Sequence, residues 1–275
     1  MNKVLIIPDI HGRTFWKEDV TSLMADIDSR AIDVVFLGDY VDPYPEEGIS
    51  DEDAVRNFRL IIVLAKGREN VHLLLGNHDL HYFKEHFVGW RDRCRYSIKH
   101  ADEIKSLFRD NHSLFKIAWQ TTINNKQFMF THAGILKNWM KSYAKTDYVP
   151  TQEYLNRLLR SKNGLSILAC ISLRRGGYAL YGSPVWADLM EHLYADDDYH
   201  DEFYQIFGHT HLSTERLGDE YKGKGVYIAS SSLAMLDAKT SFILSEDWQI
   251  KPIGVEPTYL QDDAWIFNYT NNNQE

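Results

Sequence analysis

The sequence has few cysteines, no long apolar run and no basic excess, and each shortage excludes a class of protein. Only two of its 275 residues are cysteines, and Cys94 and Cys170 form neither a disulfide framework nor a Cys-x-x-Cys pair. Free thiols of this kind are typical of the cytosol, so we expect a cytoplasmic protein. No apolar segment approaches the roughly 18 residues of a membrane span, and the N-terminus lacks the features of a signal peptide. We therefore expect no membrane partner.

The charge balance is acidic, with 30 Lys and Arg residues against 39 Asp and Glu residues and a net charge of -9 at pH 7. Proteins that coat nucleic acid neutralise phosphates with clustered basic side chains, so an extended nucleic-acid surface is not expected. The chain has one local basic run, Arg91, Arg93 and Arg95. We interpret this run as the solvated face of a helix.

Apolar runs bounded by turn signals predict strands at 3–8, 33–37, 71–75, 127–131, 204–208 and 225–229. The first three are nearly continuous Val, Ile and Leu, which is typical of strands buried on both faces. Segments with helical periodicity at 14–28 and 51–66 separate them. This order predicts an α/β fold with right-handed crossovers and a largely parallel sheet. Later in the chain, Asn124-Asn125 between apolar or β-branched flanks predicts a hairpin turn.

Two longer segments, 79–116 and 135–181, are mixed and more helical. We interpret them as helical insertions that cap one end of the sheet. No internal repeat is visible, so residues 1–268 are predicted to form a single domain. The Asn-rich tail 269–275 is expected to be flexible.

Five of the predicted strands end in His, Asp or Asn beside a glycine. The endings are Asp9-Ile10-His11-Gly12, Gly38-Asp39-Tyr40-Val41-Asp42, Gly76-Asn77-His78-Asp79, His132-Ala133-Gly134 and Gly208-His209-Thr210-His211. Ligand sites in open α/β sheets lie beyond the carboxyl ends of the strands, so these endings should converge on one site. Residues two apart on extended chain point to the same side, which we expect for Asp9 with His11 and for His209 with His211.

Imidazoles and carboxylates without thiolates suit metal ions of borderline hardness, with manganese ahead of iron or zinc. The candidate ligands are too many for one ion but suit two that share a carboxylate: Asp9, His11, Asp39, Asn77, His132, His209 and His211. Each ending has a simpler structural interpretation when taken alone, such as a helix cap at Asp9 or a core histidine at His132. Paired metal ions are typical of displacement at phosphorus, and the five endings together favour that chemistry.

The ordered motifs, which span residues 9–211, resemble those of the calcineurin-like metallophosphoesterase superfamily. GDYVD, HAG and, more loosely, PVWAD (184–188) are most similar to its phosphoprotein-phosphatase branch, whose members act on serine and threonine phosphates. The resemblance implies a sandwich of two mixed β-sheets flanked by helices, with a dinuclear metal site at the carboxyl ends of the strands. It assigns the ligands to one metal (Asp9, His11 and His211) and to the other (Asn77, His132 and His209), with Asp39 as the bridge.

The same resemblance implies that a metal-bridging hydroxide attacks a phosphomonoester directly. His78 is then the general acid on the leaving alkoxide, and Asp42 orients its imidazole. Asp79 is expected to start the following helix rather than to act chemically. The alternatives are a phosphodiesterase or dinucleoside-polyphosphate hydrolase, and a non-catalytic metal-binding scaffold, which the presence of His78 and Asp42 disfavours. The substrate could be a small molecule, a nucleotide or a phosphoprotein.

Two phosphate-binding arginines of that branch are missing. The branch continues GDYVD with Arg-Gly, where this chain has Pro43-Tyr44. Its second arginine is expected within 189–207, which contains none. A guanidinium matches phosphate oxygens well, so another arginine is expected to bind the substrate. The candidates are the pair Arg174 and Arg175 first, then Arg13, and the basic run Arg91, Arg93 and Arg95 if it is not merely a solvated helix face.

Overall fold

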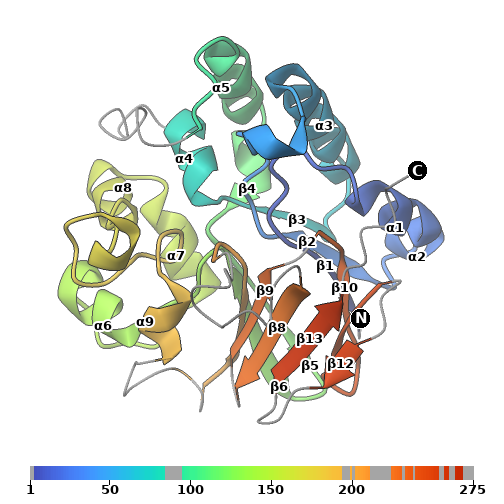
Figure 1. Cartoon of the computed structure of the whole chain (residues 1–275). Coiled ribbons are helices and arrows are strands. Elements are labelled where there is room, and N and C mark those ends of the chain that lie inside the picture. Colours follow the sequence, from blue (N-terminus) through green and yellow to red (C-terminus); the bar gives the residue numbers. More distant parts are fainter. Residues whose placement is uncertain are drawn as a thin grey trace.

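Two β-sheets lie face to face with helices outside them in the computed structural model (Figure 1). The structure describes residues 3–83, 95–193, 199, 202–210, 224–230, 233–237, 239–253, 257–259 and 264–268. The predicted tail 269–275 therefore lies outside the described residues.

The first sheet has the order β11-β10-β1-β2-β3-β4. Strands β1 to β4 run parallel to one another, as the βαβαβ pattern predicts, whereas β10 and β11 add an antiparallel edge. Its strands are β1 (Val4–Ile7), β2 (Asp33–Phe36), β3 (Val71–Leu74), β4 (Phe115–Lys116), β10 (Phe242–Leu244) and β11 (Ile250–Pro252).

The second sheet has the order β12-β13-β8-β9-β7-β6-β5, and only β7 pairs in parallel with its neighbours β6 and β9. The predicted hairpin is confirmed at β5 and β6, where Asn124 and Asn125 have φ values of 45° and 67°. Asparagine tolerates this left-handed conformation better than most residues. The strands are β5 (Ala118–Ile123), β6 (Lys126–Thr131), β7 (Tyr204–Phe207), β8 (Lys224–Ser230), β9 (Leu233–Asp237), β12 (Pro257–Tyr259) and β13 (Ala264–Asn268). Both sheets are therefore mixed.

The helices begin and end where the sequence signals them. Ser50 caps α3 by accepting the Asp53 N–H at 3.1 Å, and Gly67 follows its end with a φ of 77°. The predicted helix 14–28 is present but divides at Leu23 into α1 and α2. The α-helices are α1 (Trp16–Ser22), α2 (Met24–Asp28), α3 (Asp51–Ala65), α4 (Asn77–Phe83), α5 (Ala101–Asp110), α6 (Lys137–Trp139), α7 (Gln152–Leu158), α8 (Lys162–Leu168) and α9 (Leu189–Leu193).

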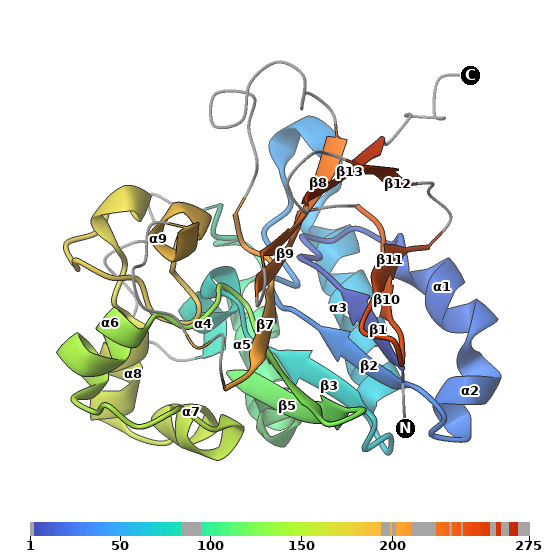
Figure 2. The ribbon, with the colours of Figure 1, turned by 90° about the horizontal axis from the view of Figure 1, so that it is seen from below.

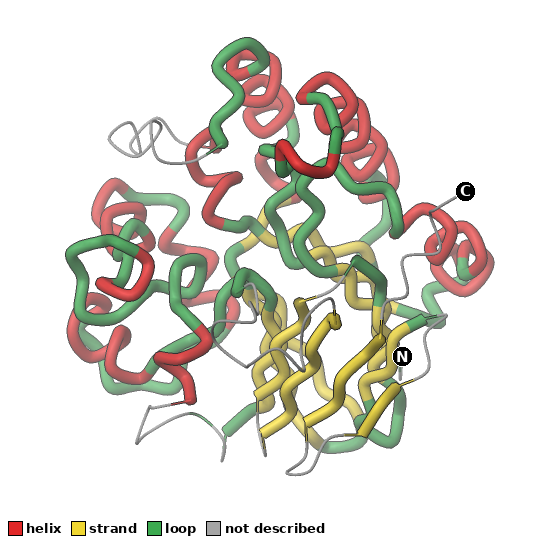
Figure 3. Tube along the Cα trace, in the orientation of Figure 1, coloured by secondary structure: helices red, strands yellow, loops and turns green. Residues whose placement is uncertain are grey.

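Short helical turns complete the connections: η1 (Pro45–Glu47), η3 (His112–Leu114), η4 (Met140–Ala144) and η5 (Leu173–Arg175). Figure 3 shows the helices above and to the sides of the strands. Helices α1, α2 and α3 lie along the first sheet, whereas α6 to α9 form a separate group at the opposite side of the molecule (Figure 2). No helix in the described part of the chain combines the length and apolar content of a membrane span.

Alternate residues of β1 explain why the first sheet is apolar on both faces. Val4 and Ile6 pack into the cluster between the sheets, and Leu5 and Ile7 pack into the cluster beneath the outer helices. Strand β2 follows the same alternation. A strand covered on both faces needs apolar residues at every position, which accounts for the continuous apolar runs of the sequence.

Candidate active site

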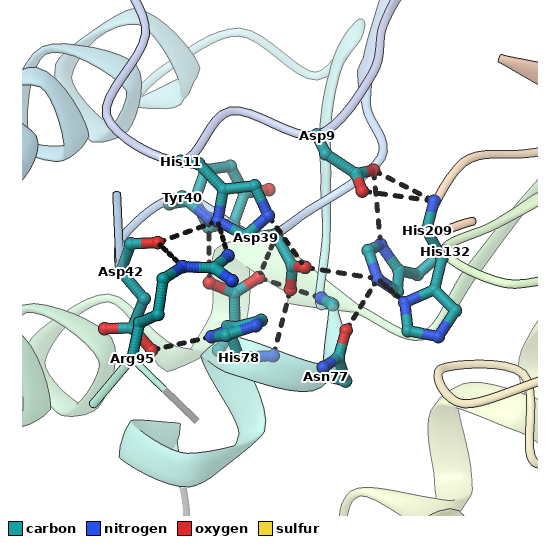
Figure 4. A network of polar contacts seen from close by, with 12 residues as sticks. Asp9, His11, Asp39, Tyr40, Asp42, Asn77, His78, Arg95, His132 and His209 are labelled. Carbon is teal, nitrogen blue, oxygen red and sulfur yellow. Dashed lines mark hydrogen bonds and ion pairs between the residues drawn. The ribbon is translucent and has the colours of Figure 1, made fainter. Parts of the chain in front are cut away.

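Five strand ends contribute to one group of polar side chains. Asp9 and His11 follow β1, Asp39 and Asp42 follow β2, and the GNHD segment follows β3 as the first turn of α4. His132 follows β6 and His209 follows β7, so the second sheet supplies these two imidazoles. Figure 4 shows the side chains turned toward a common centre around Asp39.

The backbone at this centre is left-handed. His11, Asp39, Asp42 and His209 have φ values of 43°, 54°, 60° and 68°, which non-glycine residues adopt only at a cost. The expectation that Asp9 and His11 share an extended segment is therefore wrong. The His11 N–H donates to the Asp39 carbonyl at 2.6 Å and the Gly12 N–H to the Tyr40 carbonyl at 3.1 Å, so the two loops hold each other in this conformation.

Glycines let these loops approach closely. A Cβ on Gly76 would lie 2.0 Å from Asp39 Oδ1, and a Cβ on Gly208 would lie 2.5 Å from Asp9 Oδ1. Neither distance is possible for a real side chain. At these two positions glycine is required because a candidate ligand occupies the space of its missing side chain.

Asp79 connects the loops that follow β2 and β3 through hydrogen bonds to their backbone. Its Oδ2 accepts the N–H groups of Asp39 at 2.7 Å and Gly76 at 2.8 Å, and its Oδ1 accepts the Tyr40 N–H at 2.9 Å. The side chain is fully buried. The expected place in the first turn of a helix is found in α4, but the carboxylate binds backbone from the neighbouring strand end rather than only capping its own helix.

Asp39 lies at the centre of the candidate ligands. Its Oδ1 accepts the His78 N–H at 2.9 Å, and its Oδ2 lies 3.4 Å from Nε2 of His11 and also 3.4 Å from Nε2 of His132. Burial would raise the pKa of Asp39, but the imidazoles of His132, His78 and His11 outweigh burial and lower it. The carboxylate is therefore ionised, and one oxygen faces two imidazole nitrogens.

His132 shows that this centre suits a cation. Its Nδ1 lies 2.8 Å from the Leu37 carbonyl, so Nδ1 carries the proton and Nε2 presents a lone pair. That Nε2 lies 3.0 Å from Asn77 Oδ1 and 3.0 Å from His209 Nδ1. An imidazole lone pair and an amide oxygen repel each other at this distance, and a metal ion between them would turn the repulsion into coordination. The side chains present therefore fit a metal ion.

His11 is oriented for metal binding in the same way as His132. Its Nδ1 lies 3.1 Å from the carbonyls of Val41 and of Asp42, which leaves Nε2 free to face Asp39. Burial lowers its pKa well below 6.5 although Asp39 opposes this shift, so the ring is neutral, as a metal ligand must be. Asp9 accepts the His209 N–H at 3.1 Å, and its Oδ1 lies 3.7 Å from His132 Nδ1. The structure brings six of the seven predicted ligands together, and the seventh, His211, lies outside the described residues.

The potential ligand atoms form two groups, and within each group the atoms lie within 4.8 Å of one another. One group is Asp39, His132 and His209, and the other is His11, Asp39 and His78. His78 differs from the other histidines because its Nδ1 lies 2.8 Å from Asp42 Oδ2. Burial would lower the pKa of His78, but the carboxylates of Asp39 and Asp42 together raise it. This ring therefore keeps a proton to higher pH than free histidine, which suits a proton donor better than a ligand.

Asp42 has a second partner that the sequence did not indicate. The Tyr82 hydroxyl donates to Asp42 Oδ1 at 2.5 Å, and the Ser97 N–H donates to the Tyr82 oxygen at 2.7 Å. Tyr82 is buried and stacks on Tyr96, with ring centroids 4.4 Å apart. Both oxygens of Asp42 are thus engaged, which fixes the orientation of the His78 ring. A tyrosine one helical turn after a histidine is the only local signal, and it is equally typical of core packing.

The predicted substrate arginines are engaged elsewhere. Arg13 forms a bidentate ion pair with Glu47, at 2.7 Å through Nε and 2.8 Å through Nη2, and is almost buried. Arg175 binds Asp188 at 3.0 Å and the Thr210 hydroxyl at 2.6 Å. Arg174 is exposed on η5.

Arg95 lies beside the site instead. Its Nε donates to the Asp42 carbonyl at 3.0 Å, and its guanidinium carbon lies 3.5 Å from the centre of the Tyr44 ring. Arg95 is half-buried and lies in a turn, so its interpretation as part of a solvated helix face is wrong. Arg91 and Arg93 lie outside the described residues. The basic run marked Arg95 as a candidate, but no local signal shows which arginine of the run reaches the site.

The fold and the site together define a class of protein. Two mixed sheets with imidazoles, carboxylates and an amide at adjoining strand ends define an α/β protein whose side chains could hold metal ions, a donor set that suits chemistry at phosphorus. The family model of calcineurin-like phosphoesterases matches residues 2–213, and the chain belongs to this family.

Comparison with solved structures gives a phosphatase, a phosphoesterase and a phosphodiesterase among its matches. A protein serine/threonine phosphatase from Saccharomyces cerevisiae with similarity to human phosphatase PP5 is 17% identical, over 98% of this chain and 80% of that chain, with a TM-score of 0.44. The phosphoesterase Yfce from E. coli is 14% identical over 91% of this chain and 98% of that chain, with a TM-score of 0.36. An archaeal phosphodiesterase is 11% identical over 91% of this chain and 98% of that chain, with a TM-score of 0.33. Comparison with curated protein sequences gives no match. At these low similarities the neighbours do not specify a substrate.

Proposed function

We propose that this protein is a phosphomonoesterase that uses two metal ions, with His78 as the general acid. The observation that carries the proposal is the His78–Asp42 contact of 2.8 Å, placed directly beside the converging ligand atoms. A scaffold that only bound metal would have no need of a histidine whose pKa is raised and whose ring is held by a buried carboxylate. The pair is therefore better explained by proton transfer than by structure.

Metal ions in such a site polarise the phosphoryl group and lower the pKa of a water nucleophile. Asp9, His11, Asp39, Asn77, His132 and His209 would hold them, together with His211. Asp39 would serve both ions because its Oδ2 faces His11 and His132 equally. Manganese is our first choice for a donor set of imidazoles and hard oxygens, and iron or zinc would also fit.

His78 completes the reaction on the leaving-group side. Its Nδ1 is bound to Asp42, so its Nε2 carries the proton that is available for transfer. As the phosphorus–oxygen bond breaks, the electron pair of that bond remains on the departing oxygen and takes this proton. The oxygen of a water molecule joins phosphorus, so the products are an alcohol and inorganic phosphate. Asp42, held by Tyr82, stabilises the imidazolium form of His78 before the transfer.

Hydrolysis of model esters tests the proposal. The full chain loaded with manganese, iron or zinc, with its metal content measured, should hydrolyse p-nitrophenyl phosphate with a higher kcat/KM than bis-p-nitrophenyl phosphate. The Asp39→Asn variant, purified in parallel, controls for contaminating phosphatases. A preference for the diester would assign the protein to the phosphodiesterases of its family. No hydrolysis of either ester by protein that holds two equivalents of metal would overturn the proposal.

A further inference from the structure

Arg95 is a half-buried cation with no carboxylate partner in the described part of the chain. Its contacts are the Asp42 carbonyl, the Tyr44 ring and Nδ1 of His11, the last at 3.4 Å from Nη2. His11 Nδ1 donates to two carbonyls, so it offers no lone pair to Arg95. A cation in such a place is costly unless an anion neutralises it.

The other arginines of the region do not share this property. Arg13 is neutralised by Glu47, which also binds Lys239 at 2.8 Å. Arg175 is paired with Asp188, whose other oxygen accepts the Met190 N–H at 3.0 Å at the start of α9. These two guanidinium groups would have to leave an existing carboxylate before they could bind a phosphate.

The guanidinium of Arg95 is also oriented for a ligand. Nε is occupied by the Asp42 carbonyl, Nη2 lies 3.4 Å from His11 Nδ1, and the Tyr44 hydroxyl is a further hydrogen-bond partner of the side chain, but no carboxylate among the described residues engages either Nη group. The two Nη groups form the end of the planar fork, which matches two oxygens of one phosphate. Figure 4 shows this end between His11 and His78, on the side of the site that holds the general acid.

The segment that carries Arg95 is held in place by neighbouring elements. Tyr96 stacks on Tyr82 of α4, and the Ser97 hydroxyl donates to Asp51 at 2.6 Å at the start of α3. Tyr44, one residue after the position where the phosphoprotein-phosphatase branch has its arginine, packs its ring against the guanidinium, with 3.5 Å between the ring centre and the guanidinium carbon. The position is therefore defined before any ligand binds, which reduces the entropy cost of binding.

We infer that Arg95, stacked on Tyr44, binds the phosphoryl group of the substrate and selects phosphomonoesters, whose dianion has three terminal oxygens and two charges. Arg95, some fifty residues further along the chain, thus takes the role of the arginine that is missing after GDYVD, and the Tyr44 ring packs against its guanidinium. This inference rests on the proposed function, because it concerns the substrate of the same site.

The inference is tested with metal-loaded full-length protein, comparing the wild type with Arg95→Ala, Arg95→Lys and Arg59→Ala. Arg59 lies on α3 and binds Glu103 at 2.6 Å. Its replacement by alanine is the control, because it removes the same charge at a position away from the site. Arg95→Ala should raise KM for p-nitrophenyl phosphate and the Kd for inorganic phosphate, measured by calorimetry, at least about tenfold. The increase in KM should be smaller for bis-p-nitrophenyl phosphate, and metal content should not change. Arg95→Lys should recover part of the affinity because it retains the charge but not the fork, and Arg59→Ala should match the wild type.

Three results would count against Arg95. Unchanged KM and Kd in Arg95→Ala, with an active wild type, would exclude phosphate binding by this side chain. A decrease in kcat alone would show that Arg95 positions Asp42 and His78 rather than substrate. A tenfold increase in KM for the Arg174→Ala/Arg175→Ala variant but not for Arg95→Ala would move the phosphate contact to that pair. If the wild type hydrolyses no ester yet binds phosphate through Arg95, the proposed function fails while the anion site stands.

Discussion

Asp42 Oδ2 lies 2.8 Å from Nδ1 of His78, and this contact joins a loop after β2 to the first turn of a helix after β3. The two residues are 36 positions apart and come together only because β2 and β3 are adjacent parallel strands. The contact leaves the Nε2 side of His78 for the leaving group, and it motivates the first two predictions.

His78→Asn should keep both metal ions and slow hydrolysis by about two to four orders of magnitude, the usual contribution of a positioned proton donor. The loss should be smaller for p-nitrophenyl phosphate than for an alkyl phosphate, because nitrophenolate leaves without protonation. Steady-state kinetics on both esters, with metal analysis, makes the comparison. An equal loss for both esters would argue against proton donation by His78.

Tyr82→Phe should lower kcat by roughly three- to tenfold, because Asp42 loses the hydrogen bond that fixes one of its oxygens. Without that donor the carboxylate attracts the imidazolium proton more strongly, so the pKa of His78 rises. Activity that needs protonated His78 falls as pH increases through this pKa, and the alkaline limb of the kcat profile should therefore move to higher pH. An unaltered pH profile would leave Tyr82 with only a packing role.

Asp39→Asn should nearly abolish activity and reduce metal content more than any other single ligand substitution. The neutral amide keeps the shape of the side chain but loses the charge that faces both His11 and His132 at 3.4 Å. Elemental analysis of the purified variant measures the effect. Retention of two full metal equivalents would contradict a bridging role.

Gly76→Ala should weaken metal binding by about ten- to hundredfold, which is typical when the support of a ligand is disturbed. The new Cβ would lie 2.0 Å from Asp39 Oδ1 and would displace the carboxylate from the His78 N–H. Gly67→Ala is the control for backbone strain away from the ligands, since its φ of 77° also disfavours alanine but nothing lies within 4 Å of its added Cβ. Titration of both variants with manganese should separate them, and equal affinities would show that Asp39 can move without loss.

His72 should make stability depend on pH. Its Nε2 lies 3.1 Å from Asp33 and its Nδ1 3.3 Å from the Lys116 ammonium, and its ring stacks on Trp119. Burial lowers its pKa, although Asp33 opposes this shift. As pH falls below 6.5, His72 therefore binds a proton in the unfolded chain before it does so in the folded protein. The free energy of unfolding decreases over this range, and the decrease ends once pH falls below the lower pKa of the folded protein.

The loss from His72 should reach up to about 1.4 kcal/mol per pH unit. His72→Gln keeps a donor and an acceptor but does not titrate, so it should remove this part of the pH dependence in urea unfolding of the metal-free protein between pH 5 and 7. His112→Gln, an exposed histidine, provides the comparison. The same slope in His72→Gln and the wild type would contradict the assignment.

The sequence by itself determined the strands and the residues that follow them. Apolar runs, the Asn124-Asn125 turn and the Ser50 cap are local signals, because each depends on a few neighbouring residues and their backbone preferences. Parallel strands then carry their endings to one edge, so six predicted ligands and the His78–Asp42 pair could be named before any contact was known.

The tertiary structure alone decided which arginine faces the site and how the loops are strained. Arg95 reaches Asp42 across 53 positions, and Arg13 finds Glu47 across 34, although both are equally suitable for phosphate in the sequence. The left-handed φ of His11 likewise depends on the Asp39 loop that holds it, since local preference disfavours that conformation. Ion pairs and strained turns are settled by contacts between distant segments, and the periodicity of a sequence reports only on neighbours along the chain.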